Sequence, residues 1–184
     1  MIGNDIIDLS IAKIESNWHR RGFLEKLFTE NEQKLISAAP NPFVIVWKFW
    51  SMKEAAYKVY TQQDKQRFFA PKKFDCLLIS ENKGLVNFKN QIFYTSTIVT
   101  RSYIFTLASV EKEIKAYSKI VMPQFIDNMI KIKLQDLTSF YAEEIKQKKT
   151  KNMVPLYYYR DILLTKSCSI SHHGKYGVFS LLYS

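Results

Sequence analysis

The feature that most constrains the fold is one long apolar segment, residues 44–60, which has the spacing of a helix. A helix that is apolar on nearly every side must be covered by other elements, so this segment predicts the centre of a packed domain. Lys53, Glu54 and Lys58 nevertheless lie inside it. Glu54 and Lys58 are four residues apart and can form a simple ion pair on one face of the helix. The same charges on a rigid helix also suit a phosphate group together with Mg²⁺, which prefers carboxylate oxygens.

The segments that follow predict an antiparallel sheet. Residues 74–80, 85–99 and 102–110 are rich in β-branched and aromatic side chains, and turn-like sequences separate them. Residues 124–151 have helical character, and residues 168–183 predict a hairpin. The chain lacks the alternation of strands and helices that indicates a doubly wound parallel sheet. The expected fold class is therefore α+β, with an antiparallel sheet packed against helices.

The start of the chain predicts a short strand and two capped helices. Residues 6–9 are mostly apolar and predict a strand, or a strand that runs into a helix; Ser10 can supply the N-cap of the helix that follows. Gly22 is expected to break this helix. Thr29, with Glu32 three residues later, has the pattern of a capping box at the start of the next helix.

The size and composition of the chain indicate an ordinary globular domain. It has 184 residues, and 47% of them are hydrophobic, which is enough for a core without disulfides. Cys76 and Cys168 lie far apart, and no Cys/His spacing typical of zinc is present. The first residues lack the basic region of a signal peptide, and no apolar run approaches the ~20 residues that span a membrane. We therefore expect a reduced, cytoplasmic protein.

The net charge of +10 favours polyanionic partners, namely nucleic acid, phosphorylated ligands or an acidic protein. An ordinary solvated basic surface is the alternative. A nucleic-acid-binding protein would use the basic runs 20–21, 72–73 and 146–151 together with the aromatic residues, which are 15% of the chain. Most of these aromatics lie in predicted core strands, however, and no recognisable nucleic-acid-binding motif is present. With five glycines, the chain also has no glycine-rich phosphate loop.

Two further segments carry polar groups that suit a phosphate site. Asp5 stands in an otherwise apolar stretch, and Asp8 follows it; each can instead form a turn or cap a helix. In the predicted C-terminal hairpin, Ser171 and His172 end the first strand and His173 begins the turn. A histidine in such a hairpin is most often a surface residue or a hydrogen-bonded one.

Taken together, these segments resemble the motifs of the 4′-phosphopantetheinyl transferase superfamily. Residues 3–5 match its G-x-D motif, and residues 50–58 match its W/F-[SCT]-x-K-E-[AS]-x-x-K helix, which is the more specific of the two. Residues 28–32 resemble the F-T-x-x-E step between them, and residues 169–182 resemble the I-S-H segment and the strand after it. This order of motifs is that of the compact holo-acyl-carrier-protein synthases.

The resemblance covers residues 1–75 and 152–184 of what we expect to be a single domain, residues 1–184. The middle region, residues 76–150, is longer than the compact type requires. The larger, surfactin-synthetase-activating type often has a glutamate two residues after the G-x-D aspartate, where this chain has Ile7. The compact type often has an acid one residue further on, which here is Asp8.

The resemblance implies an activity. It implies transfer of the 4′-phosphopantetheine group from coenzyme A to a serine of an apo carrier protein, with release of 3′,5′-ADP. Asp5 and Glu54 would bind Mg²⁺ or Mn²⁺, and Lys58 together with Lys53 would neutralise phosphate oxygens. Glu54 or a water on the metal would take the proton of the serine. The carrier could serve fatty-acid, polyketide or peptide synthesis. A relative that binds coenzyme A or a carrier without catalysis is the alternative, and retention of Asp5, Glu54 and Lys58 argues against it.

The resemblance also implies partners. Ser171 and His172 would lie near the nucleotide end of coenzyme A. Arg20 and Arg21 resemble in position the basic residues that family members offer to an acidic carrier, although an ordinary solvated patch would look the same.

The expected assembly is a homo-oligomer. In the compact type the site lies between subunits of a trimer, so we expect a trimer in which Asp5 and Glu54 face His172 of an adjacent chain. The alternative is a monomer in which the chain folds back through residues 76–150 and brings His172 beside its own Glu54.

Overall fold

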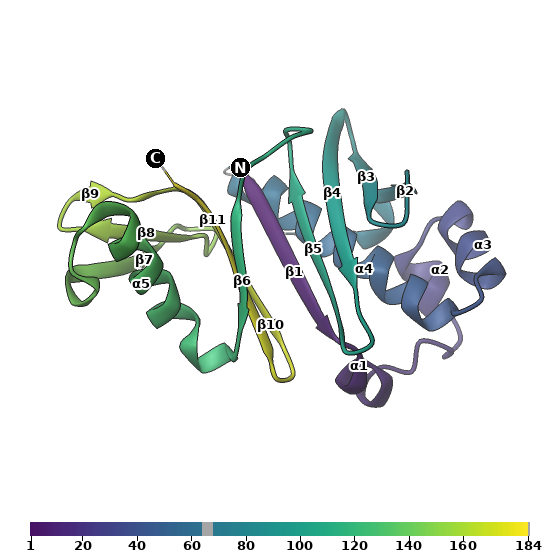
Figure 1. Ribbon diagram of the computed structural model, residues 1–184. Helices are drawn as coiled ribbons and strands as arrows, with labels where there is room; N and C mark the ends of the chain where they lie inside the picture. Colours follow the sequence, from purple (N-terminus) through teal and green to yellow (C-terminus); the bar gives the residue numbers. More distant parts are fainter. Residues whose placement is uncertain (64–67, 184) are drawn as a thin grey trace.

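The first part of the chain forms a five-stranded antiparallel sheet that is covered on one face by a long helix (Figure 1). The computed structural model describes residues 1–63 and 68–183. The elements of this part are β1 (Ile2–Asp8), α1 (Leu9–Glu15), α2 (Phe23–Leu27), α3 (Glu30–Ala38), α4 (Pro42–Gln62), η1 (Pro71–Lys73), β2 (Asp75–Leu78), β3 (Lys83–Phe88), β4 (Gln91–Val99) and β5 (Tyr103–Ser109). The strands lie in the order β1-β5-β4-β3-β2.

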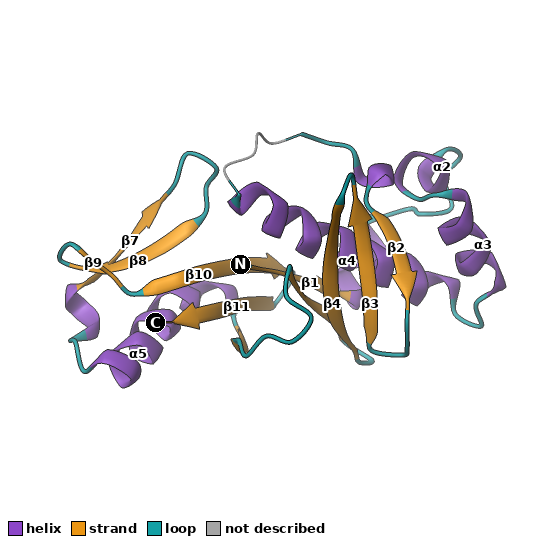
Figure 2. Ribbon diagram, turned by 90° about the horizontal axis from the view of Figure 1, so that it is seen from above, coloured by secondary structure: helices purple, strands orange, loops and turns teal. Residues whose placement is uncertain are grey.

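The second part of the chain forms two smaller sheets around one helix. Its elements are β6 (Tyr117–Val121), η2 (Pro123–Phe125), α5 (Ile126–Thr138), η3 (Ala142–Glu144), β7 (Ile145–Lys149), β8 (Pro155–Tyr159), β9 (Ile162–Leu163), β10 (Thr165–His173) and β11 (Tyr176–Tyr183). One sheet has the order β10-β11-β6 and the other has the order β7-β8-β9. Figure 2 shows α5 beside the β10–β11 hairpin and α4 behind the five-stranded sheet.

The two parts share one arrangement of elements. In the first, β1 leads to α4, and the later hairpin β4–β5 returns so that β5 pairs with β1. In the second, β6 leads to α5, and the later hairpin β10–β11 returns so that β11 pairs with β6. The chain therefore repeats one topology that its sequence does not display as a repeat. No described helix is long and apolar enough to cross a membrane.

A close approach of β1 to α4 positions the residues that matter below. A Cβ atom at Gly3 would lie 2.1 Å from the carbonyl oxygen of Ala55. Glycine is therefore required where the strand crosses the helix. Alternate residues of β1 face α4, which puts Asp5 on the same side as Gly3. The alternation of side chains along β1 thus directs one carboxylate toward the helix that carries Glu54 and Lys58.

Serine and asparagine side chains join β1 to β10, the two strands at which the parts meet. The backbone N–H of Ile2 donates to Ser167 Oγ over 3.0 Å, and that of Asn4 donates to Ser169 Oγ over 2.9 Å. Asn4 Nδ2 also donates to the Ser169 carbonyl and to Ser180 Oγ. Because these groups are buried and mutually satisfied, they hold the two strands side by side.

Most of the predicted elements are confirmed. The apolar segment 44–60 lies within α4, the predicted meander is β2 to β5, and the C-terminal hairpin is β10–β11. The capping box of Thr29 and Glu32 is present at the start of α3. The α+β fold class with antiparallel sheets is also confirmed.

Two local predictions are wrong. Asp8, and not Ser10, is the N-cap of α1, and its side chain accepts from the N–H groups of Ser10 and Ile11. The helical character predicted for residues 124–151 ends at Thr138, because Ser139 adopts the left-handed conformation (φ 62°) that terminates α5. The basic residues that follow form β7, where Ile145 is buried and the lysines are exposed.

Candidate active site

One pocket of about 720 Å³ gathers residues from all three motif segments. Asp5 of β1, Glu54 of α4 and His172 of β10 line it. The segment between α1 and α2 contributes two arginines, and α2 contributes Lys26. The other lining residues are Ile6, Ile7, Ser16, Arg20, Arg21, Gly22, Phe23, Leu27, Trp47, Trp50, Phe69 and His173.

The two carboxylates influence each other strongly. Burial, together with the negative charge of Asp5, raises the pKa of Glu54 to about 7 against the opposing effect of Lys58. Burial also raises the pKa of Asp5, again opposed by Lys58. Two acids that interact in this way do not both ionise readily near neutral pH unless a cation compensates them.

Lys58 supports Asp5 instead of pairing along its own helix. Among the described residues its ion pair is with Asp5 Oδ1, at 3.5 Å, and its ammonium also donates to the Asn4 carbonyl over 2.7 Å. The simple Glu54–Lys58 pair that the helical spacing allowed is therefore not what the structure forms. Lys58 is not among the described residues that line the pocket, and it reaches the site through Asp5.

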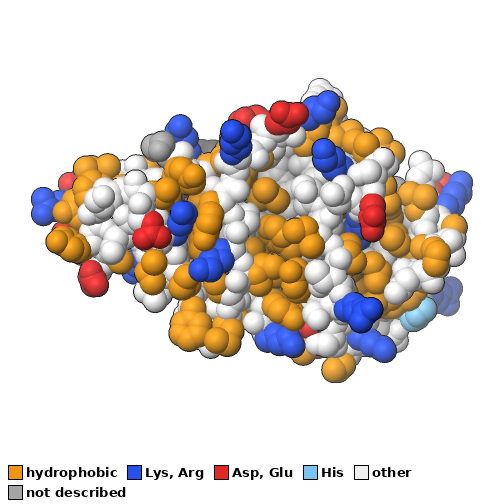
Figure 3. Space-filling view, viewed as in Figure 1, with side chains coloured by type: hydrophobic (Ala, Val, Ile, Leu, Met, Phe, Trp, Pro, Cys, Tyr) orange, Lys and Arg blue, Asp and Glu red, His pale blue; other side chains and the backbone are white. Residues whose placement is uncertain are grey.

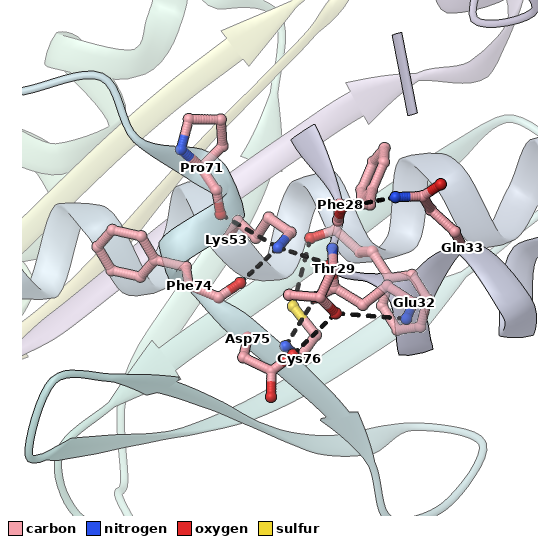
Figure 4. A network of polar contacts seen from close by, with 10 residues as sticks. Phe28, Thr29, Glu32, Gln33, Lys53, Pro71, Phe74, Asp75 and Cys76 are labelled. Atoms are coloured by element: carbon pink, nitrogen blue, oxygen red, sulfur yellow. Dashed lines mark hydrogen bonds and ion pairs between the residues drawn. The ribbon is translucent and has the colours of Figure 1, made fainter. Parts of the chain in front are cut away.

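Lys53 lies elsewhere, in a buried network shown in Figure 4. Its ammonium is 2.9 Å from Glu32 Oε2 and donates to the carbonyls of Pro71 and Phe74, and its side chain is 1% exposed. Glu32 Oε1 in turn accepts from the N–H of Cys76 over 2.8 Å. The expected contact between Lys53 and phosphate is therefore corrected. Because this ammonium is enclosed and fully bonded, it ties α3, α4 and the start of β2 together.

Successive side chains of the C-terminal hairpin, Ser171 and His172, change from a buried to an exposed position. His172 is exposed and faces the pocket, whereas Ser171 is buried and is not among the described residues that line the pocket. His173 also lines the pocket, and its Nδ1 accepts from the backbone N–H of Asp8 over 2.9 Å. Sequence reasoning assigned His173 only to the turn, and the period-two alternation alone does not reveal its bond to Asp8.

The comparisons with known proteins decide the family. The family model of the 4′-phosphopantetheinyl transferase superfamily matches residues 1–108, which is more than half of the chain. The chain belongs to this superfamily. No curated protein matches it. Among solved structures, the chain is similar to Helicobacter pylori holo-[acyl-carrier-protein] synthase in complex with coenzyme A, with 14% identity, all of both chains covered and a TM-score of 0.28.

In this superfamily member, one chain supplies both sides of the pocket. Asp5 and Glu54 come from the part matched by the family model, and His172 comes from the second part of the same chain. The expectation that His172 of an adjacent chain would face Glu54 is therefore corrected. The chain instead folds back so that its own His172 lines the pocket with Asp5 and Glu54, because β10 lies against β1 through the bonds of Asn4 and Ser169.

The carboxylates fit a divalent cation that is also bound by a substrate. Asp5 Oδ2 is buried and has no hydrogen-bond partner among the described residues, although a buried carboxylate oxygen ordinarily has one. No group of three or more His, Cys, Asp or Glu side chains in the described part of the chain could hold a metal ion by itself. Mg²⁺ is commonly held by one or two carboxylates together with substrate phosphates and water, so Asp5 and Glu54 fit such a partial shell.

Proposed function

We propose that this protein transfers the 4′-phosphopantetheine group of coenzyme A to a serine hydroxyl of an apo carrier protein and releases 3′,5′-ADP. The observation that carries the proposal is the single pocket in which Asp5 and Glu54 lie together with cationic side chains. Family membership supports the type of reaction. The pocket also has the size of a small-molecule site.

Asp5 and Glu54 would hold Mg²⁺, which when bound would neutralise charge on the pyrophosphate of coenzyme A. The chain's own cations would do the same at the edges of the site. Arg20, Arg21 and Lys26 line the pocket, and phosphate oxygens are natural partners for them. Transfer of a phosphoryl-type group depends mainly on such positioning and charge neutralisation.

Glu54 is the group best suited to accept the proton of the serine. Its carboxylate lines the pocket beside Asp5, and a carboxylate within hydrogen-bond reach of a hydroxyl can act as its general base. In this step the serine oxygen forms a bond to the phosphorus that carries the pantetheine arm. The bond from that phosphorus to the bridging oxygen breaks, and 3′,5′-ADP leaves with the electron pair. The serine proton passes to the Glu54 carboxylate.

His172 is proposed to contact the nucleotide end of coenzyme A. It is exposed and lines the same pocket as the two carboxylates, and its ring carries nitrogen atoms that can bind phosphate or ribose. Ser171 is buried, so its proposed role near the nucleotide is limited to supporting the strand that presents His172.

The carrier is proposed to approach across Arg20 and Arg21. Both side chains are exposed, and Arg20 lies over the ring of Phe23 at 5.4 Å, which fixes its direction. The net charge of +10 would attract an acidic carrier. Association that depends on these charges should weaken as the salt concentration rises.

A transfer assay tests the function. The protein is incubated with coenzyme A, Mg²⁺ and a panel of apo carriers from fatty-acid, polyketide and peptide synthesis, and the intact mass of each carrier is measured. We expect at least one carrier to gain one phosphopantetheine, and we expect EDTA to abolish the gain. The proposal fails if no carrier gains mass while a competent control enzyme modifies the same panel. Binding of coenzyme A without transfer would then indicate a non-catalytic relative.

We also propose a homo-oligomer, with a trimer as the expected form. The support is an apolar surface on the sheet face opposite α4, where Leu77, Ile92 and Ile98 are about half exposed (52%, 49% and 51%). Figure 3 shows apolar side chains gathered on this side of the molecule. Light scattering should give a mass above the 21.7 kDa of one chain, and Ile98→Glu should reduce it. A mass of one chain at every concentration would refute this proposal.

A further inference from the structure

We propose that Asp8 is a positioning residue that fastens the tip of the β10–β11 hairpin to the start of α1 and thereby sets where His172 stands in the pocket. We call Asp8, His173, Gly174 and Lys175 the hairpin clasp. Its effect on catalysis rests on the proposed function, whereas its effect on structure does not.

The clasp joins residues at opposite ends of the chain. The backbone N–H of Asp8 donates to Nδ1 of His173 over 2.9 Å. The backbone N–H of Lys175 donates to Asp8 Oδ2 over 3.4 Å. Asp8 itself is 1% exposed, so water does not compete easily for these bonds. The backbone and the carboxylate of one residue therefore hold both sides of the hairpin turn.

The two oxygens of Asp8 have separate roles. Oδ1 caps α1, accepting from the N–H of Ser10 over 3.0 Å, from the Ser10 hydroxyl over 2.6 Å and from the N–H of Ile11 over 3.4 Å. Oδ2 faces the hairpin. Asparagine is as good an N-cap as aspartate, but its amide nitrogen cannot accept a hydrogen bond. Asp8→Asn should therefore keep the cap and lose the contact to Lys175.

Gly174 shows how closely the hairpin tip sits on Asp8. A Cβ atom at this position would lie 2.6 Å from Asp8 Oδ2 and 2.7 Å from Ile11 Cγ1, and the residue has a φ of +55°. Gly22 has a φ of +80° but no atom within 4 Å of its missing Cβ. Gly22→Ala therefore measures only the loss of stability caused by a positive φ at a non-glycine residue. Gly174→Ala has the same effect and in addition pushes the hairpin tip away from Asp8.

The position of the clasp connects it to the site. His172 precedes the clasped residues directly, and Asp5 lies on the same strand as Asp8. Further along the two strands, Asn4 holds Ser169, so loss of the clasp would release the tip and not the whole hairpin. The distance between His172 and the carboxylates should then increase, and a ligand that contacts both sides of the pocket should bind less tightly.

The test compares Asp8→Asn with Ser10→Ala, which removes a bond to Oδ1 and leaves the hairpin contact intact. Hydrogen exchange reports the clasp without reference to activity. We expect the amides of residues 172–176 to exchange faster in Asp8→Asn and in Gly174→Ala, and not in Ser10→Ala or Gly22→Ala. If Asp8→Asn does not fold, Gly174→Ala tests the same contact from the other side. Unchanged exchange at the tip in the folded variant would overturn the proposal.

Kinetics then tests the consequence for the site. We expect Asp8→Asn to raise KM for coenzyme A about tenfold, as for loss of one hydrogen bond to a charged group, with kcat changed less than about threefold. The effects of Asp8→Asn and Gly174→Ala on KM should not add, because both release one contact. A fall in kcat with KM unchanged, or simple additivity, would overturn the positioning role. If Asp8→Asn exchanges faster at the tip while the wild-type protein transfers nothing, the clasp stands and only the proposed function is refuted.

Discussion

Replacing Glu54 by glutamine should stabilise the metal-free protein while abolishing transfer. The folded protein raises the pKa of Glu54 from 4.5 to about 7. Between these values the unfolded chain has lost its proton and the folded chain has kept it, so stability falls as the pH rises from 4.5 to about 7 and then stays low. A difference of about 2.5 pKa units corresponds to about 3 kcal/mol, and glutamine, which has no charge, removes this cost.

Thermal unfolding in EDTA measures the effect. At pH 8 the Glu54→Gln variant should melt roughly 6 to 12 °C above the wild-type protein, since about 1 kcal/mol shifts the melting temperature by 2 to 4 °C in a chain of this size. At pH 4.5 the two should melt together. Glu113→Gln, at an exposed loop position, serves as the control and should show no such difference. Equal melting temperatures of Glu54→Gln and wild type at both pH values would show that burial of the Glu54 carboxylate does not destabilise the folded protein.

Three further substitutions test other parts of the site. Lys58→Ala should weaken coenzyme A binding about tenfold in calorimetry and reduce stability by no more than about 1 kcal/mol, because its ion pair with Asp5 is partly exposed. Lys53→Met should lower the free energy of unfolding by about 3 to 5 kcal/mol in urea titrations, because it leaves the Glu32 carboxylate buried and unpaired, and adding Glu32→Gln should recover part of the loss. Asp8→Asn should be less stable than wild type at pH 7. Burial acts to raise the pKa of Asp8 in the folded protein, but its hydrogen bonds, mainly those from Ser10, outweigh burial and lower this pKa. The difference in stability should therefore disappear as the pH falls below the ordinary carboxyl pKa of 3.8.

The sequence was informative wherever local pattern decides structure. The apolar run of α4, the capping box at Thr29 and the alternating strands follow from side-chain periodicity and turn residues, which act over a few neighbours. Asp5, Glu54 and His172, which the motif positions single out, lie together in one pocket.

The sequence is less informative where contacts between residues far apart in the chain determine the structure. Lys53 and Glu54 are adjacent, yet a helix turns them to different sides, and only the buried Glu32 reveals that Lys53 faces the core. The folding of β10 against β1 depends on bonds such as Asn4 to Ser169, between residues 165 positions apart. The sequence pattern predicts a helix where β7 lies, because the lysines of this segment are compatible with either structure, and only pairing with β8 determines that it is a strand.

The central claim is that one chain combines the two carboxylates and His172 in one transferase site. Glu54→Gln and His172→Ala are each expected to be inactive, and the most direct measurement is the transfer rate of an equimolar mixture of the two, assayed with coenzyme A, Mg²⁺ and a carrier that the wild-type protein modifies. We expect no recovery of activity on mixing, because each chain builds its own complete site. Recovery toward a quarter or more of the wild-type rate would contradict it, because activity could then arise only from sites shared between chains.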